Sequence, residues 1–236
     1  MREGSWKGGT PSACRSRLAA RTALPWAAGA VLALGFAASP RASTTPPEPS
    51  RKPDAWVRAL AERGQAPVDL VLAALDRHDL LIFDDALHHA VEPFELYRSL
   101  LRDRRVHSRV RTVFVEVFSI AAQPHLDAYL ASPVDDRSLL APVFRDDFSG
   151  YGWRYATYLD LLATVREVNQ GLPPAERVRV VGVDQPVWWA AIRTRADYEL
   201  FQASLAGRDF FLYTTIRERM HAFREGEKAF FLTNTR

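Results

Sequence analysis

The sequence predicts an α/β fold, with a single domain built on a mostly parallel central sheet flanked by helices. Short apolar stretches, typical of buried strands, alternate along the chain with longer stretches of helical spacing. Strands separated by helices of ten or more residues indicate βαβ units, which build parallel sheets. The chain has 236 residues, enough for one domain with a full core.

Each element is expected from its own local pattern. The stretch TVFVEVF at residues 112–118 is rich in β-branched and aromatic residues, which favour strands. Gly171 and two prolines follow residues 155–170 and end a long amphipathic helix there. The expected strands are residues 80–83, 112–118, 178–183 and 229–232. The expected helices are residues 55–63, 68–77, 92–104, 121–131, 138–143, 155–170, 197–206 and 209–225.

A basic and then apolar leader precedes this domain. Residues 23–38 form an apolar run shorter than the roughly 20 residues of a spanning helix, so residues 1–42 are expected to be a signal peptide. The protein would then be exported, to the periplasm, the cell envelope or the exterior. The alternative is an uncleaved membrane anchor at residues 23–38. Residues 43–53, rich in Pro and Thr, are the expected linker, and residues 54–236 the domain.

The charge and cysteine content argue against nucleic-acid binding and against a cysteine-ligated zinc site. Residues 1–42 hold six of the 31 basic residues and one of the 28 acids, which leaves 25 basic and 27 acidic residues in the remainder. No basic patch therefore argues for nucleic acid as a partner. The one cysteine, Cys14, lies in the leader, so the domain forms neither an internal disulfide nor a cysteine-ligated zinc site.

Titratable side chains gather directly after the first expected strand. LLIF is followed by Asp84 and Asp85, and then by His88, His89 and Glu92. In open α/β sheets, ligand sites lie beyond the carboxyl ends of the strands. If the chain is already helical at this point, His88 and Glu92 share a face, and Asp85 can meet His88 across one turn. We therefore expect the functional site here.

Two more strands carry an acid near their carboxyl ends. Glu116 lies inside TVFVEVF, and Asp184 ends VVGVD. Because the carboxyl ends of parallel strands share one edge of a sheet, these acids are expected to converge with the first cluster. A buried strand does not tolerate an unpaired carboxylate, so Glu116 belongs either to the site or to a structural salt bridge with an arginine.

Taken together, these motifs resemble a known superfamily. Asp85-x-x-His88-x-x-x-Glu92 after an apolar strand is similar to the glutamate-x-x-histidine-x-x-x-glutamate motif of the erythromycin esterases, whose relatives include haem-binding ChaN-like and TraB/Tiki-type proteins. The strands that carry Glu116 and Asp184 resemble two further family strands. The likeness extends from about residue 79 to 236. It also includes the segment QPHLDAYL at 123–130, Trp153, Tyr158 and the pair Arg208-Asp209.

The resemblance implies hydrolysis of an ester, lactone or similar bond of a small-molecule substrate. His88 would be the general base, and Asp85, Glu92, Glu116 and Asp184 the acids that complete the catalytic set. Two alternatives stay open for a cofactor. The same histidine and carboxylates could hold a divalent metal ion with an open position for water. In a ChaN-like protein of the cell envelope, haem would instead be held by His88, His125 or Tyr129.

The chain departs from the family pattern in two places. The first motif usually begins with Gly-Glu, where this chain has Asp84 and Asp85, and a shorter acid moves its oxygens. The family's final histidine is not found before Arg236, so we expect a truncated domain or an inactive relative. Asp84 and His89 are expected to be bystanders, Asp84 as a helix N-cap, and Glu92 has an alternative as an ordinary first-turn acid.

Overall fold

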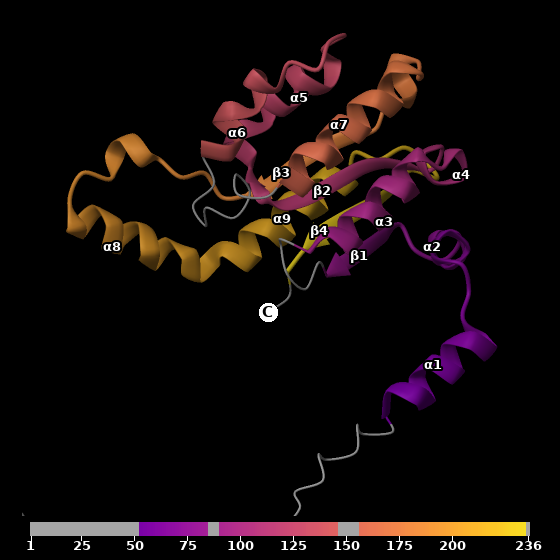
Figure 1. The fold of residues 1–236 in the computed structure, drawn as a ribbon. Coiled ribbons are helices and arrows are strands. Elements are labelled where there is room, and N and C mark those ends of the chain that lie inside the picture. Colours follow the sequence, from indigo (N-terminus) through magenta and orange to yellow (C-terminus); the bar gives the residue numbers. More distant parts are fainter. Residues whose placement is uncertain (1–51, 85–89, 146–155, 235–236) are drawn as a thin grey trace, which may run out of the picture. The chain divides into compact units, whose positions relative to one another are not determined.

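The expected α/β fold, a single domain with a mostly parallel central sheet, is confirmed, and the observed sheet is all-parallel. The computed structural model describes residues 52–84, 90–145, 156–234, and the chain divides into Met1–Ser50 and Arg51–Arg236. Within the described part, one four-stranded sheet has the order β1-β4-β2-β3, and all neighbours are parallel (Figure 1). The strands are β1 (Leu80–Asp84), β2 (Val110–Ser119), β3 (Arg179–Asp184) and β4 (Lys228–Thr233).

The helices lie close to the positions that periodicity predicted. They are α1 (Lys52–Arg63), α2 (Pro67–Leu75), α3 (Val91–Arg102), α4 (Arg104–His107), α5 (Gln123–Ala131), α6 (Ala141–Arg145), α7 (Ala156–Gln170), α8 (Arg195–Ser204) and α9 (Arg208–Met220). Among the described residues, no helix is both long and apolar enough to cross a bilayer, and the expected leader at residues 1–42 lies outside that part.

The two faces of the sheet are covered by different helices. One core cluster joins β2 to α3, α5 and α7, and Tyr158 of α7 packs edge-to-face on Phe94 at 4.6 Å and on Phe118 at 5.6 Å. The other cluster joins Phe114 and Phe231 to α9. Side chains alternate along a strand, so Glu116 lies on the α9 face, like Phe114. Tyr158, one of the motif residues, is therefore part of the core.

α3 begins at Val91, one residue before the predicted start at residue 92. Ala90 is the N-cap residue, with extended backbone angles. The physical reason is Pro93, which lacks the N–H that would bond the carbonyl of His89 in a helix begun earlier. α3 therefore begins after residue 88, so the condition under which His88 and Glu92 would share a face of this helix is not met. Asp84 is not its N-cap, because it ends β1.

Gly182 lets the carboxyl ends of β2 and β3 come together. The pairing register of these strands shifts between Val115 and Ser119. At the shift, the carbonyl oxygens of Phe118 and Ser119 each lie 2.7 Å from the place where a Cβ of Gly182 would stand. A side chain at this position would push against backbone atoms, which cannot move without the strand. The irregularity that places Asp184 thus requires glycine.

Gly182→Ala is expected to lower the free energy of unfolding by about 1 to 3 kcal/mol, because overpacking against backbone forces the strands apart. Urea denaturation at neutral pH measures this. The matched control is Gly171→Ala, whose added Cβ meets its nearest atom at 3.6 Å, an ordinary contact. Equal stabilities of the two variants would contradict the role given to Gly182.

Candidate functional site

One arginine joins two buried acids at the carboxyl edge of the sheet. Arg208 is the first residue of α9. Its Nε and Nη2 donate to the two carboxylate oxygens of Asp184, at 2.8 Å and 3.0 Å. Its Nη1 lies 2.9 Å from Oε1 of Glu116. The guanidinium therefore holds the ends of β2 and β3 together through a bidentate pair and a single one.

The second oxygen of Glu116 is bound by the neighbouring strand. Oε2 accepts a hydrogen bond from the Thr233 hydroxyl at 2.8 Å and from the backbone N–H of Asn234 at 2.6 Å. Thr233 lies beside Glu116 because Val115 pairs with Leu232, one residue earlier in both strands. Both oxygens of Glu116 are thus occupied by donors, as a buried carboxylate requires.

Burial sets the electrostatics of this cluster. Glu116 and Asp184 are 7% and 2% exposed, so neither carboxylate is compensated by bulk water. Burial raises the pKa of Asp184, and the hydrogen bonds and charge of Arg208 act against this rise. The alternative that Glu116 pairs with an arginine is therefore confirmed, and Asp184 shares the same partner.

The third strand end lies next to this cluster. Asp84, the last residue of β1, pairs in register with Thr233 of β4 and is exposed. Acids from β1, β2 and β3 thus reach one edge of the sheet, with a threonine between them on β4. The expected convergence of strand-end acids is confirmed for Glu116 and Asp184. On β1 the residue that the structure describes is Asp84.

A cavity of about 600 Å³ opens beside the cluster, between β1 and α9. Its wall is apolar and includes Leu80 and Ile82 of the edge strand, with Leu212 and Tyr213 of the helix. Its polar end is formed by Glu116, Arg208, Asp209, Thr233 and Asn234. A volume of this size suits a small organic molecule. The arrangement fits a ligand with an apolar body and one polar group.

Four of the candidate site and motif residues lie outside the described part of the chain. Asp85, His88 and His89 lie outside the described residues, so their roles stay predictions. Glu92 is exposed in the first turn of α3 and fits the alternative of an ordinary first-turn acid. Trp153 also lies outside the described part of the chain.

Two of the three residues expected to ligate haem, His125 and Tyr129, belong to α5. His125 is exposed in its first turn, whereas Tyr129 is fully buried. The Tyr129 hydroxyl donates to Oδ1 of Asp135 at 2.7 Å. Burial, followed by Asp135, raises the pKa of Tyr129 to about 12. Both the buried position of Tyr129 and the neighbouring carboxylate therefore oppose formation of the phenolate that would ligate haem.

The divalent-metal alternative finds no support in the described residues. No three of their His, Cys, Asp or Glu side chains lie together in a group that could hold a metal ion. The two buried acids at the carboxyl edge bind Arg208 instead.

Sequence reasoning missed the residues that hold the site together. Arg208 entered only as part of a short motif, and Thr233 and Asn234 were not considered. A usable signal was present for Arg208, because a buried strand acid demands a cation and Arg208 begins the helix before β4. Nothing local indicates that Thr233 and Asn234 lie beside Glu116, since that depends on the insertion of β4 between β1 and β2.

No family model and no curated protein matches the sequence. Several solved structures are similar. One described as bacterial protein toxins is 18% identical, with a TM-score of 0.47, and the match covers 78% of this chain and 36% of that one. The type III effector HopBA1 is 15% identical, with a TM-score of 0.49 and 72% coverage of both chains. RRSP, a MARTX toxin effector domain from Vibrio vulnificus CMCP6, is 20% identical, with a TM-score of 0.46 and coverage of 78% and 33%.

These findings correct the family assignment. The similar structures are described as toxins and effectors, and none of the three descriptions names an esterase or a haem-binding protein. The assignment to the erythromycin esterases, with their ChaN-like and Tiki-type relatives, is therefore wrong, as are the hydrolase-family and haem-binding-family labels that came with it. Cleavage of an ester by this chain is a separate prediction, which these comparisons do not test. This chain spans about a third of the two toxin chains and 72% of HopBA1. We take no activity from them.

Arg208→Met is expected to lower the free energy of unfolding by about 3 to 5 kcal/mol at pH 7, because it leaves two buried carboxylates without their cation. At pH values above the raised pKa of Asp184 in the folded protein, its carboxyl group is ionised. The whole loss of stability caused by Arg208→Met is then present. As the pH falls toward about 4, the carboxyl group of Asp184 takes up a proton in the folded state at a higher pH than in the unfolded state. The loss of stability caused by Arg208→Met therefore becomes smaller.

Urea denaturation of Arg208→Met at pH 7 and pH 5 measures both effects. The control is Arg219→Met on the exposed side of the same helix, where a change within about 0.5 kcal/mol is expected at both pH values. A deficit for Arg208→Met that grows on acidification would contradict the assignment.

Proposed function

We propose that the carboxyl edge of the sheet is an active site that performs acid–base chemistry on a small-molecule substrate. The observation that carries this proposal is the position of the Glu116–Arg208–Asp184 cluster. Its two acids are buried, all three side chains are held by fixed hydrogen bonds or ion pairs, and Glu116 and Arg208 line the polar end of a cavity of about 600 Å³. Open α/β sheets bind their ligands at this edge.

The hydrogen bonds assign different roles to the acids. Glu116 already accepts from Arg208, Thr233 and Asn234, and Asp184 from Arg208 and the backbone N–H of Gln185. Carboxylate oxygens engaged in this way are turned toward the protein and not toward a substrate in the cavity. Glu116 and Asp184 are therefore positioning residues in our proposal, which hold Arg208 and the strand ends at a fixed place.

The proton acceptor would then come from the segment that follows β1. His88 follows Asp84 by four residues, and a neutral imidazole can accept a proton from water near pH 7. Our proposed reaction is attack of that water on an ester or lactone carbonyl. Arg208 is the one cation among the described residues that line the cavity, and through its contacts with Glu116 and Asp184 it would hold the polar end of the cavity in a fixed position around the reacting carbonyl.

The apolar wall would hold the rest of the substrate. Ile82 and Tyr213 are 60% and 55% exposed, which leaves apolar surface open along the cavity between β1 and α9. Burial of an acyl chain against this surface would gain about 25 cal/mol for each Å² of apolar area removed from water. We therefore expect longer acyl esters to be better substrates than acetates.

His88→Ala is expected to lower kcat/KM for ester cleavage about 100-fold or more, the usual contribution of a general base. The assay uses the full chain with p-nitrophenyl acetate, butyrate and octanoate, and with dihydrocoumarin as a lactone. His89→Ala is the matched control, because this neighbouring histidine is expected to be a bystander. Turnover by the parent that persists unchanged in His88→Ala would contradict the role of His88.

Glu116→Gln tests the positioning role separately. The amide keeps the size of the side chain but loses the charge that holds Arg208, so kcat is expected to fall about tenfold with a smaller change in KM. The variant's free energy of unfolding is measured in parallel, so that lost activity is separated from lost fold. Absence of turnover of all these esters by the parent would refute the proposed reaction.

A further inference from the structure

The opposite edge of the sheet carries a second cavity of about 650 Å³, at the amino ends of β2, β3 and β4. Five of its lining side chains are arginines and three are glutamates, an excess of two positive charges. None of these residues belongs to the carboxyl-edge site, and the reaction proposed above does not use them. Cavities of this size hold molecules as large as a sugar phosphate.

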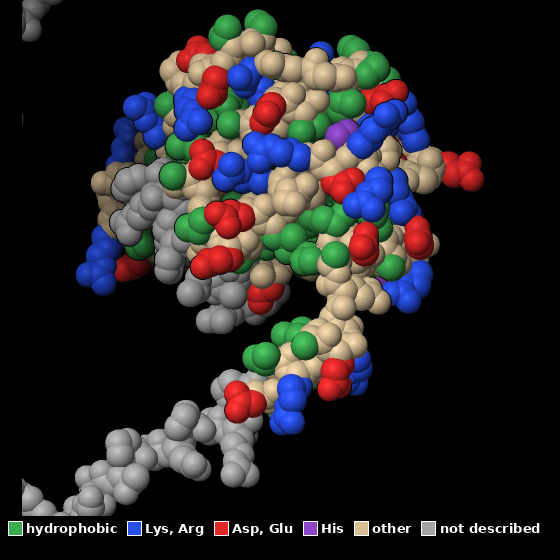
Figure 2. Space-filling model, turned by 45° about the vertical axis from the view of Figure 1, so that its right-hand side comes forward, with side chains coloured by type: hydrophobic (Ala, Val, Ile, Leu, Met, Phe, Trp, Pro, Cys, Tyr) green, Lys and Arg blue, Asp and Glu red, His purple; other side chains and the backbone are tan. Residues whose placement is uncertain are grey.

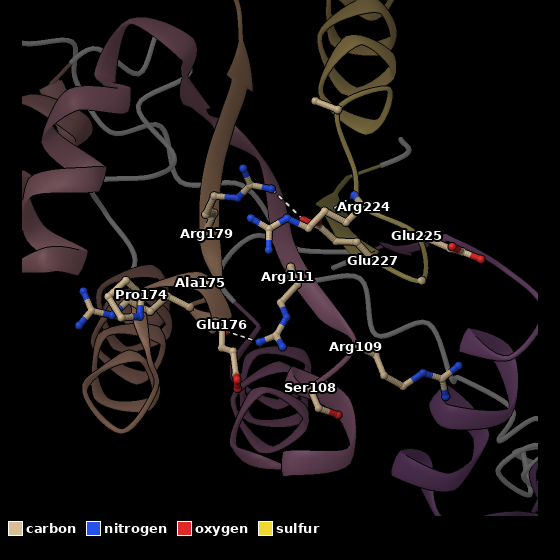
Figure 3. A pocket seen from close by; sticks show the side chains of 13 residues that line it. Ser108, Arg109, Arg111, Pro174, Ala175, Glu176, Arg179, Arg224, Glu225 and Glu227 are labelled. Carbon is tan, nitrogen blue, oxygen red and sulfur yellow. Dashed lines mark hydrogen bonds and ion pairs between the residues drawn. The ribbon is translucent and has the colours of Figure 1, made fainter.

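Three of the arginines point into this cavity from different parts of the chain. Arg111 is on β2, Arg179 begins β3, and Arg224 precedes β4 (Figure 3). In the same view Arg109 points away, and its Nη2 lies 2.9 Å from Oδ1 of Asp76. Arg109 lines the cavity edge but is engaged elsewhere.

The partners of these three arginines leave charge uncompensated. Arg179 donates to Oε1 of Glu227 at 2.8 Å and to the Thr112 hydroxyl at 3.2 Å. Arg111 donates to a neutral acceptor, the backbone carbonyl of Glu176. For the guanidinium of Arg224, the described residues provide neither an ion pair nor a hydrogen bond. Of three guanidinium charges, one is matched by a carboxylate and two are not.

The cluster is held in place by a tight turn. The backbone N–H of Glu227 donates to the carbonyl of Arg224 at 3.0 Å, and Gly226 has the positive φ of 79° that glycine tolerates best. The Glu227 side chain, 10% exposed, also accepts from the backbone N–H of Arg224 at 3.2 Å. Glu227 thus ties the turn to Arg179 and positions both arginines.

We propose that this amino-edge cavity binds a phosphate monoester on the guanidinium groups of Arg111, Arg179 and Arg224. A phosphate monoester carries about 1.5 to 2 negative charges at pH 7, which matches the two uncompensated positive charges. Guanidinium groups bind phosphate through paired, charge-assisted hydrogen bonds. The ligand is either a soluble phosphorylated molecule or the headgroup of a phosphorylated lipid, since both present the same group.

A nucleic acid backbone fits the observations less well. Its phosphates need an extended basic stripe, whereas basic and acidic side chains are interspersed on the face shown in Figure 2. The three arginines instead line one cavity, whose size suits a single phosphorylated group and not a run of phosphates.

The test titrates the full chain with phenyl phosphate by isothermal calorimetry, and in a second arm sediments it with phosphatidylcholine vesicles with and without phosphatidylinositol 4-phosphate. Arg224→Gln is expected to raise Kd about tenfold or more, the effect of one lost charge-assisted contact. Because Arg224 uses only its backbone in the turn, this variant keeps the fold. Arg111→Gln should act in the same direction, and Arg109→Gln is the matched control with unchanged Kd.

Each outcome decides the proposal. Arginine-dependent binding of phenyl phosphate supports a soluble ligand, and arginine-dependent binding of the phosphoinositide vesicles alone supports a lipid headgroup. Binding in neither arm overturns the proposal. An equal loss in Arg109→Gln and Arg224→Gln would show general charge attraction and also overturns it, as would a short DNA duplex that binds more tightly than phenyl phosphate does.

Discussion

The buried contact of Arg208 with Glu116 and Asp184 is the interaction on which the carboxyl edge depends. Two carboxylates at the ends of neighbouring strands repel each other and are costly to bury. A single guanidinium at the start of α9 pairs with both and fixes the helix against β2 and β3. Thr233 completes the set from β4. The cluster thus connects the sheet, the helix and the cavity beside them.

The arginines at the two edges of the sheet differ in whether a carboxylate pairs with them, and their proposed functions differ for this reason. At the carboxyl edge Arg208 is surrounded by acids and serves to hold them. At the amino edge Arg111 and Arg224 have no carboxylate partner within the described part of the chain. A compensated arginine organises a site, whereas an uncompensated one is available to an anion from solution.

Much of the fold followed from local pattern. Apolar runs predicted β1 and β3 to within a residue at each end, and parallel topology predicted that Glu116 and Asp184 would meet at one edge. The strand order was not predictable, because insertion of β4 between β1 and β2 is a nonlocal choice. The partners of Glu116 depend on that order. The start of α3 was also predictable, because Pro93 favours the first turn of a helix, and the expected start at residue 92 lies within one residue of the observed one. The family assignment was wrong because it rested on a combination of short motifs, each of which is common.

The most direct test of the central claim is Arg208→Lys, compared with the parent in ester turnover per folded molecule. Lysine keeps the charge but has one ammonium group, which cannot reproduce the bidentate pair with Asp184 and reach Glu116 as well. We predict a folded protein whose kcat/KM is lower by about tenfold or more, because the strand ends are no longer held at fixed positions. A folded Arg208→Lys variant with the turnover of the parent would contradict the account.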